Sequence, residues 1–195
     1  KTWNNHGSIA PFNHRWYVFY HRSSQGTRFS RRVCIEPITF RPDGGIDEVE
    51  MTTQGGTAPP DATRPLDASR ACLLHGQVYV ATEGPTAACE RVSERLTHIH
   101  NSDWAAYKYL DFGSGVTGFT AEAGSCSEGG TIEVRIDYPD GPLLGTCLVP
   151  PTGGWRKRQR VTCPVTAAGG IHALYLVFRG GAGRLFDLKR LVFSR

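Results

Sequence analysis

The stretch Thr131-Ile132-Glu133-Val134-Arg135-Ile136 decides the fold class, because apolar and polar side chains alternate along it. A period of two is typical of a β-strand that has one face in a core and the other in solvent. Similar short runs occur at Trp16-Tyr17-Val18-Phe19-Tyr20 and Ala173-Leu174-Tyr175-Leu176-Val177-Phe178, and turn signals such as Pro139-Asp140-Gly141 separate them. Few stretches show the 3.6-residue apolar period of a helix, so the chain is expected to be all-β.

The composition of the chain excludes several classes of protein. A hydrophobic share of 39% and a charged share of 21% are typical of a globular protein and not of a disordered one. No apolar run approaches the roughly 20 residues that a membrane-spanning helix needs. The net charge of +4 is mild, and no aromatic-rich nucleic-acid motif is present. We therefore expect neither a membrane nor a nucleic acid among the partners.

One basic cluster, Arg156-Lys157-Arg158-Gln159-Arg160, stands apart from the otherwise scattered charges. Such a cluster can attract phosphate or an acidic polysaccharide. Its alternation with polar neighbours after Trp155 favours the other interpretation, a solvated strand face.

The cysteines indicate an oxidising setting. There are six, widely spaced, with no C-x-x-C pair and no run at zinc spacing, which favours disulfides over metal binding. We expect a secreted, extracellular protein whose signal peptide lies upstream, because the first residues lack the features of one. The sequence leaves the pairing open among Cys34, Cys72, Cys89, Cys126, Cys147 and Cys163.

A change in amino-acid composition marks a domain boundary. From Gln54 to Pro65 the chain has three prolines and no large apolar side chain, so residues 57–65 are predicted to be a linker between a first piece, 1–56, and a domain at 66–195. The first piece is too short to close a typical β domain. We expect it to expose apolar surface unless it packs on further strands or on the second domain.

Four motifs follow one another in the first piece: Asn4-Asn5-His6-Gly7-Ser8-Ile9, Trp16-Tyr17-Val18-Phe19-Tyr20-His21-Arg22, Asp43-Gly44-Gly45-Ile46 and Met51-Thr52-Thr53-Gln54-Gly55. In their order and spacing this piece resembles the C-terminal end of a glycoside hydrolase family 43 catalytic domain, a five-bladed β-propeller that acts on xylan and arabinan side chains. The resemblance implies a parent hydrolase of the arabinofuranosidase or xylosidase type. The family's three catalytic carboxylates lie upstream of the Asn-His-Gly motif, so no catalytic residue is assigned here. His6 matches a histidine of the central channel near a bound ion.

Five motifs follow one another in the second piece: Asn101-Ser102-Asp103-Trp104-Ala105-Ala106-Tyr107, Asp111-Phe112-Gly113, Gly129-Gly130-Thr131-Ile132-Glu133-Val134-Arg135, Pro151-Thr152-Gly153-Gly154-Trp155 and His172-Ala173-Leu174-Tyr175-Leu176-Val177-Phe178-Arg179-Gly180. With these motifs the piece resembles carbohydrate-binding module family 6 from about Leu66 to Phe193. The resemblance implies an antiparallel, jelly-roll-like β-sandwich, preceded here by the last propeller strands, and it agrees with the alternation described above.

A sugar site needs an exposed aromatic ring for the C–H face of a pyranose and polar groups for its hydroxyls. Trp155 is the leading candidate, because Thr152-Gly153-Gly154 presents it on a loop. The matching tryptophan of the family forms one wall of a cleft at the loop end of the sandwich. Packing of Trp155 in the core is the alternative. The position of the opposite wall, often tyrosine in the family, is His98. The hydrogen-bonding asparagine at the base is replaced by Asp187, which keeps acceptors but loses amide donors.

A second candidate site lies on the concave sheet face, where Trp104 and Glu133 match the family's stacking and hydrogen-bonding positions. Glu133 and Arg135 project together on the outward face, so a plain ion pair is an equal alternative. His98 and His100 form a possible metal pair, because both rings are expected to project from one strand face, but they lack a third ligand and metal binding is disfavoured.

Many family members hold a structural calcium through acids of the first strand and an aspartate near the C-terminus. Here Asp67 remains, Ser69 replaces the second acid, and Lys189 stands at the C-terminal position. We expect the Lys189 ammonium to take the cation's place beside Asp67, so that no calcium and no other cofactor is bound.

These features predict a non-catalytic module that keeps an attached hemicellulose-degrading hydrolase on plant cell-wall xylan or arabinoxylan. Two alternatives stay open. In one, the chain is the C-terminal fragment of that hydrolase. In the other, the sandwich only packs on the propeller and binds no sugar, which the changes at His98 and Asp187 favour.

Overall fold

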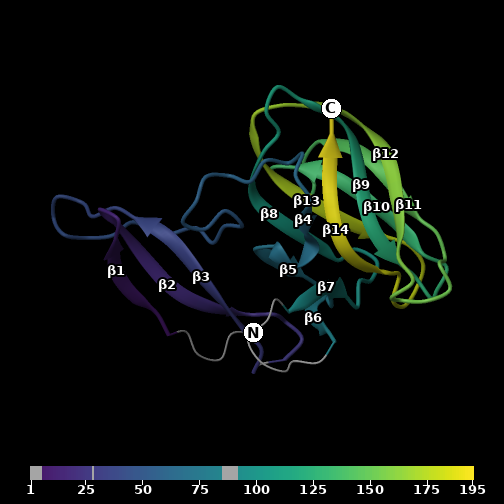
Figure 1. Ribbon diagram of the computed structural model, residues 1–195, viewed down its shortest axis with the longest axis horizontal. Coiled ribbons are helices and arrows are strands. Elements are labelled where there is room, and N and C mark those ends of the chain that lie inside the picture. Colours follow the sequence, from purple (N-terminus) through teal and green to yellow (C-terminus); the bar gives the residue numbers. More distant parts are fainter. Residues whose placement is uncertain (1–5, 28, 85–91) are drawn as a thin grey trace.

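Two antiparallel sheets face each other in the computed structural model, which describes residues 6–27, 29–84 and 92–195 (Figure 1). One sheet has the strand order β11 (Leu143–Val149), β10 (Gly130–Ile136), β13 (Ile171–Arg179), β8 (Trp104–Asp111) and β5 (Leu73–His75). The other has the order β12 (Gln159–Ala168), β9 (Val116–Gly124), β14 (Asp187–Ser194), β7 (Ser93–Thr97) and β6 (Tyr79–Glu83). The short β4 (Leu66–Asp67) also pairs with β14, and a 3-10 turn, η1 (Ala68–Arg70), follows it. The expectation of an all-β antiparallel sandwich is confirmed.

The alternation in β10 places the core between the sheets. Ile132 and Val134 are fully buried, whereas Glu133 and Arg135 lie half-buried on the opposite face of the strand. Fully burying such an apolar side chain contributes about 1.5–3 kcal/mol. Aromatic rings also pack side by side within one sheet: the ring of Phe193 on β14 lies 5.1 Å from that of Phe119 on the neighbouring strand β9.

The first piece forms a separate three-stranded antiparallel sheet of β1 (Ser8–Phe12), β2 (Arg15–Ser23) and β3 (Arg31–Ile38). It extends away from the sandwich on the left of Figure 1. Apolar side chains stand exposed on it, with Phe12 71% and Val33 84% accessible. Exposed apolar side chains on so small a sheet call for further packing partners.

Polar contacts join the first piece to the sandwich. The Val80 N–H donates to the Ser24 carbonyl (2.9 Å), and the Glu50 carboxylate accepts hydrogen bonds from Lys108 Nζ and the Tyr109 hydroxyl (2.7 Å each). The Arg22 guanidinium donates to the Ala71 carbonyl. The two pieces are therefore held by directional bonds between loops and strand ends.

The predicted linker, residues 57–65, lies against the sandwich. The Ala62 N–H donates to the Asp111 carbonyl (2.8 Å), and the Asp111 N–H donates to the Pro60 carbonyl (2.9 Å). Ala62 is buried in the core. Residues 57–65 therefore pack along the edge of the sandwich.

The expected disulfides are absent among the five cysteines that the structure describes, all of which are free thiols; Cys89 lies outside the described residues. Cys34 and Cys72 donate to nearby backbone carbonyls, and Cys126 is exposed. Burial, and then the neighbouring Cys163, raise the pKa of Cys147 to about 12, so the thiol stays protonated and unreactive at neutral pH. No helix in the described residues has the length and apolar character needed to cross a membrane.

Candidate functional site

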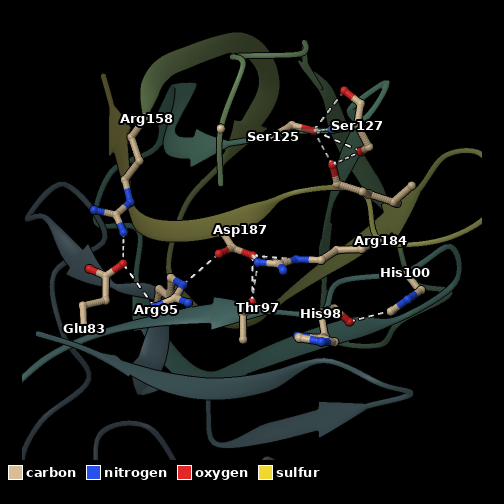
Figure 2. Close-up of polar contacts among 12 residues, drawn as sticks. Glu83, Arg95, Thr97, His98, His100, Ser125, Ser127, Arg158, Arg184 and Asp187 are labelled. Carbon is tan, nitrogen blue, oxygen red and sulfur yellow. Dashed lines mark hydrogen bonds and ion pairs between the residues drawn. The ribbon is translucent and has the colours of Figure 1, made fainter. Parts of the chain in front are cut away.

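Several loops meet at one end of the sandwich, and Ser125 after β9 ties two of them together. Its carbonyl accepts the N–H groups of Thr152 (2.9 Å) and Gly154 (3.1 Å). Its hydroxyl donates to the Leu185 carbonyl at 2.5 Å (Figure 2). The Leu185 N–H in turn donates to the Ile99 carbonyl (2.8 Å). The loops that carry Trp155 and His98 and the start of β14 at Asp187 are thereby fixed relative to one another. We call this region the loop-end site.

Trp155 lies half-buried in the loop between β11 and β12. Gly153 permits the turn before it, with a φ of +76° that side-chain-bearing residues rarely adopt. Gly124 of β9 lies directly under the loop, and a β-carbon there would stand 2.8 Å from the Trp155 carbonyl oxygen. The small residues therefore let the loop cross the end of β9 closely.

Asp187 is fully buried, and hydrogen bonds occupy both of its carboxylate oxygens. Oδ2 accepts from Arg95 Nε (2.7 Å), whereas Oδ1 accepts from the Thr97 hydroxyl (2.8 Å) and from Arg184 Nη2 (2.5 Å). The Asp187 carboxylate, which was predicted to bind sugar hydroxyls at the bottom of the cleft, thus accepts its hydrogen bonds from side chains of the protein itself. Its acceptors position two guanidinium groups and are not presented to solvent.

Arg184 lies between Asp187 and Trp155. Its guanidinium carbon stands 3.8 Å from the centroid of the Trp155 ring, within the range of a cation–π contact. Its Nη2 also donates to the Thr97 hydroxyl (2.8 Å), whereas Nη1 donates no hydrogen bond within the described part of the chain. The donors nearest the aromatic wall therefore belong to Arg184.

His98 is exposed beside this group, and its ring lies 4.8 Å from that of Tyr79. The strand β7 ends at Thr97, so His98 and His100 sit in the following loop and not on a strand face as expected. Partial burial, and then the positive charge of Arg184, lower the pKa of His98. His98 is consequently a neutral ring at pH 7, paired with a tyrosine ring that the sequence did not point to.

A continuous chain of ion pairs extends from the loop-end site (Figure 2). Arg95 bridges Asp187 and Glu83, with Nη1 3.3 Å from Glu83 Oε1, and Arg158 also pairs with Glu83. Arg156, Lys157 and Arg158 precede β12, which begins at Gln159. The interpretation of the basic cluster as a strand face is wrong for these three residues, because the loop that presents Trp155 continues through them.

On the concave sheet face, Trp104 is flanked by two rings. The His75 ring is nearly parallel to it, at 5.2 Å and 4°, and the Tyr175 ring contacts it edge-on at 5.5 Å. Trp104 and Glu133 lie in one row across the sheet, separated by Val177 of β13. Neighbouring strands lie about 4.8 Å apart, which places the two positions roughly 10 Å from each other.

Glu133 forms ion pairs on this face. Its Oε2 accepts from Arg135 Nε (3.0 Å), and its Oε1 lies 3.3 Å from Arg179 Nε. Although partial burial opposes the shift, hydrogen bonds from both arginines hold the pKa of Glu133 below its usual value. The carboxylate thus forms the ion pair with Arg135 that was the alternative to sugar binding, and it forms a second ion pair with Arg179.

The predicted ion-proximal residue, His6, lies far outside this region. Its ring stacks on that of His21 in β2, with centroids 6.0 Å apart. Within the ranges that the structure describes, no group of three or more metal-ligating side chains is present, either at His6 or at His98 and His100.

The predicted contact between Lys189 and Asp67 is wrong. Lys189 Nζ donates to Ser93 Oγ (2.5 Å) and the Glu94 carbonyl (2.6 Å), and Arg190 makes the contact with Asp67 at 3.2 Å. The cause is strand register: Arg190 stands opposite Asp67 in the β14–β4 pairing, and successive side chains point to opposite faces.

The sequence did not single out Arg184 or Ser125. Arg184 follows a run rich in glycine, and only its spacing of three residues from Asp187 hinted at an ion pair. Nothing in the sequence marks Ser125 as the anchor of two loops, because its partners, the Leu185 carbonyl and the Thr152 hydroxyl, are distant along the chain.

Comparison with protein families and known proteins agrees with this architecture. The model of the carbohydrate-binding module family 6 matches residues 74–195. A solved family 6 module from Clostridium cellulolyticum, in complex with xylose, is 36% identical and has a TM-score of 0.61, covering 69% of this chain and 99% of that one.

Longer proteins match almost the whole chain. The arabinoxylan arabinofuranohydrolase of Paenibacillus polymyxa is 35% identical over 98% of this chain and 31% of its own length. The crystal structure of a glycoside hydrolase family 43 arabinoxylan arabinofuranohydrolase from Bacillus subtilis, in complex with cellotetraose, is 32% identical with a TM-score of 0.70, over 98% of this chain and 41% of that one. The chain thus spans about a third of the curated relatives it matches, 31% and 38% in the first two.

Proposed function

The chain belongs to carbohydrate-binding module family 6, and from this premise we propose that it binds the β-linked xylan backbone of plant cell walls at the loop-end site. The observation that carries the proposal is the half-buried Trp155, held on a loop by Ser125 beside the N–H donors of Arg184. An aromatic wall next to planar donors is what a pyranose requires. Arg184 supplies the donors that Asp187 lacks.

The loop-end site is favoured over the concave face because Trp104 and Glu133 already contact other side chains of the protein. The Trp104 ring is flanked by His75 and Tyr175, and the Glu133 carboxylate is paired with two arginines. A sugar bound there would have to displace these contacts. The likeness to a xylose complex of a family 6 module supports xylan as the ligand class.

We further propose that the whole protein is an extracellular glycoside hydrolase acting on arabinoxylan, as its relatives are named, and that the module holds it on the polymer. Tethering raises the effective concentration of substrate at the attached catalytic domain even when each sugar contact is weak. A second function, rigid packing without sugar binding, is favoured by the bonds from Arg22, Ser24 and Glu50 to the sandwich.

Affinity electrophoresis of the whole chain in native gels tests the proposal. We expect migration to be slowed by soluble arabinoxylan in the gel and unchanged by an unrelated neutral polymer such as dextran. Equal migration in all gels would contradict sugar binding and favour the packing role.

We propose that no calcium is held at the family's position. Ca²⁺ takes about 6–8 oxygen ligands. Here the Asp67 carboxylate is paired with Arg190, and the Ser69 carbonyl accepts a hydrogen bond from Arg32 (3.3 Å). These residues do not fit the ion.

Chelation is therefore expected to leave the module unchanged. The thermal unfolding midpoint should move by less than about 1 °C after dialysis against EDTA, because removal of a ligand that is not bound has no effect on stability. Elemental analysis before dialysis is expected to find no stoichiometric calcium. A calcium atom retained per chain, or a clear drop in the midpoint, would contradict the proposal.

A further inference from the structure

The network behind the loop-end site carries an excess of positive charge. Among the residues that the structure describes, four cations share two carboxylates there, through ion pairs that link them in one chain. The next carboxylate along β7, that of Glu94, is paired with Arg32 of the first piece and does not offset the excess. The four cations are Arg95, Arg158, Arg184 and Lys189, and the two carboxylates are Glu83 and Asp187.

Two further cations extend this charge to the surface next to Trp155. Arg156 and Lys157 follow it directly and are exposed, and neither side chain forms a hydrogen bond or ion pair with any residue that the structure describes. The Lys157 side chain passes over Gly154, and its Nζ lies 4.0 Å from where a β-carbon on Gly153 would be. The Lys157 charge therefore borders the loop that carries Trp155, Arg156 adjoins Trp155 in sequence, and neither has a counter-ion among the residues that the structure describes.

Resting on the proposed function, we propose that the loop-end site selects xylan that carries carboxylate groups, that is, chains substituted with uronic acid residues. The pyranose of the backbone stacks at Trp155. The substituent's carboxylate faces Lys157, Arg156 and the unbonded Nη1 of Arg184. A charge-assisted bond between such a cation and a carboxylate is roughly twice as strong as a neutral one.

The surroundings of His98 agree with a positive field at this site. After partial burial, the charge of Arg184 is the next cause of the lowered pKa of this ring. The Glu83 carboxylate gives the same indication, because Arg158 and Lys189 hold its pKa low against the opposing effect of burial. The Glu83 carboxylate therefore stays ionised and keeps its cations in place, while the side chains of Arg156 and Lys157 remain available to a ligand.

A matched pair of polymers tests the inference in the whole 195-residue chain. Glucuronoxylan is compared with the same preparation after chemical reduction of its carboxyl groups, by affinity electrophoresis at low and high salt. We expect binding to glucuronoxylan about fivefold tighter than to the reduced polymer, from two exposed ion pairs. Salt at 0.5 M should remove this preference, because it screens exposed charges.

The double variant Arg156→Gln/Lys157→Gln is expected to lose the preference and to bind the reduced polymer as the wild type does. The control variant Arg15→Gln/Arg64→Gln removes the same charge from exposed positions elsewhere and should keep the preference. Equal binding of both polymers by the wild type, or a preference that survives the double variant, would overturn the inference while the proposed function stands. Binding of neither polymer would overturn both.

Discussion

Replacement of Asp187 by alanine is expected to lower the free energy of unfolding by about 3 kcal/mol, because removing one partner of a buried ion pair leaves uncompensated charge behind. Asp187 is fully buried, and the side chains of Arg95 and Arg184 are only 12% and 21% accessible. For a chain of this length, the unfolding midpoint should fall by roughly 6–12 °C. Thermal unfolding followed by circular dichroism measures the change.

The exposed pair of Asp67 and Arg190 provides the matched control. Both side chains are about half accessible, and their ion pair is 3.2 Å long. Asp67→Ala should cost at most about 1 kcal/mol, the usual limit for a surface salt bridge. A midpoint for Asp187→Ala that equals that of Asp67→Ala would show that the buried network contributes little to stability.

Trp155→Ala is expected to weaken binding to xylan by roughly thirtyfold or more, since truncating an aromatic anchor at the centre of a binding site removes about 2 kcal/mol or more. The loop itself should remain, because Ser125 holds it through the Thr152 and Gly154 backbone. Retardation in xylan gels, measured at several polymer concentrations, gives the affinity.

Trp104→Ala serves as the comparison, because Trp104 is also half-buried in the same domain. It should retain affinity close to that of the wild type, once unfolding midpoints confirm that both variants are folded. Loss of binding in Trp104→Ala alone would move the site to the concave face. Loss in neither variant would count against both sites.

The strands could be predicted from sequence because each depends on local alternation. The runs at 16–20, 132–136 and 173–178 lie within β2, β10 and β13. The loop position of Trp155 could also be predicted, since Gly153 and Gly154 mark a turn just before it.

The polar partners could not be predicted in the same way, because they depend on register and on contacts between distant segments. Lys189 and Arg190 are neighbours in sequence, yet the β14–β4 register gives the contact with Asp67 to Arg190. Arg95 and Asp187 are 92 residues apart, and only the closed sandwich brings them together. The basic cluster was similarly misjudged, because the loop after Trp155 runs on to Arg158 before β12 begins.

The tryptophan indole N–H resonances offer the most direct test of the claim that xylan binds at the loop-end site. The chain has four tryptophans, so its ¹⁵N-labelled form gives four indole signals that single Trp→Phe variants can assign. On titration with xylohexaose, we predict that the Trp155 signal shifts in a saturable manner while the Trp104 signal stays in place. A spectrum in which Trp104 shifts and Trp155 does not, or in which no indole signal moves, would contradict the account.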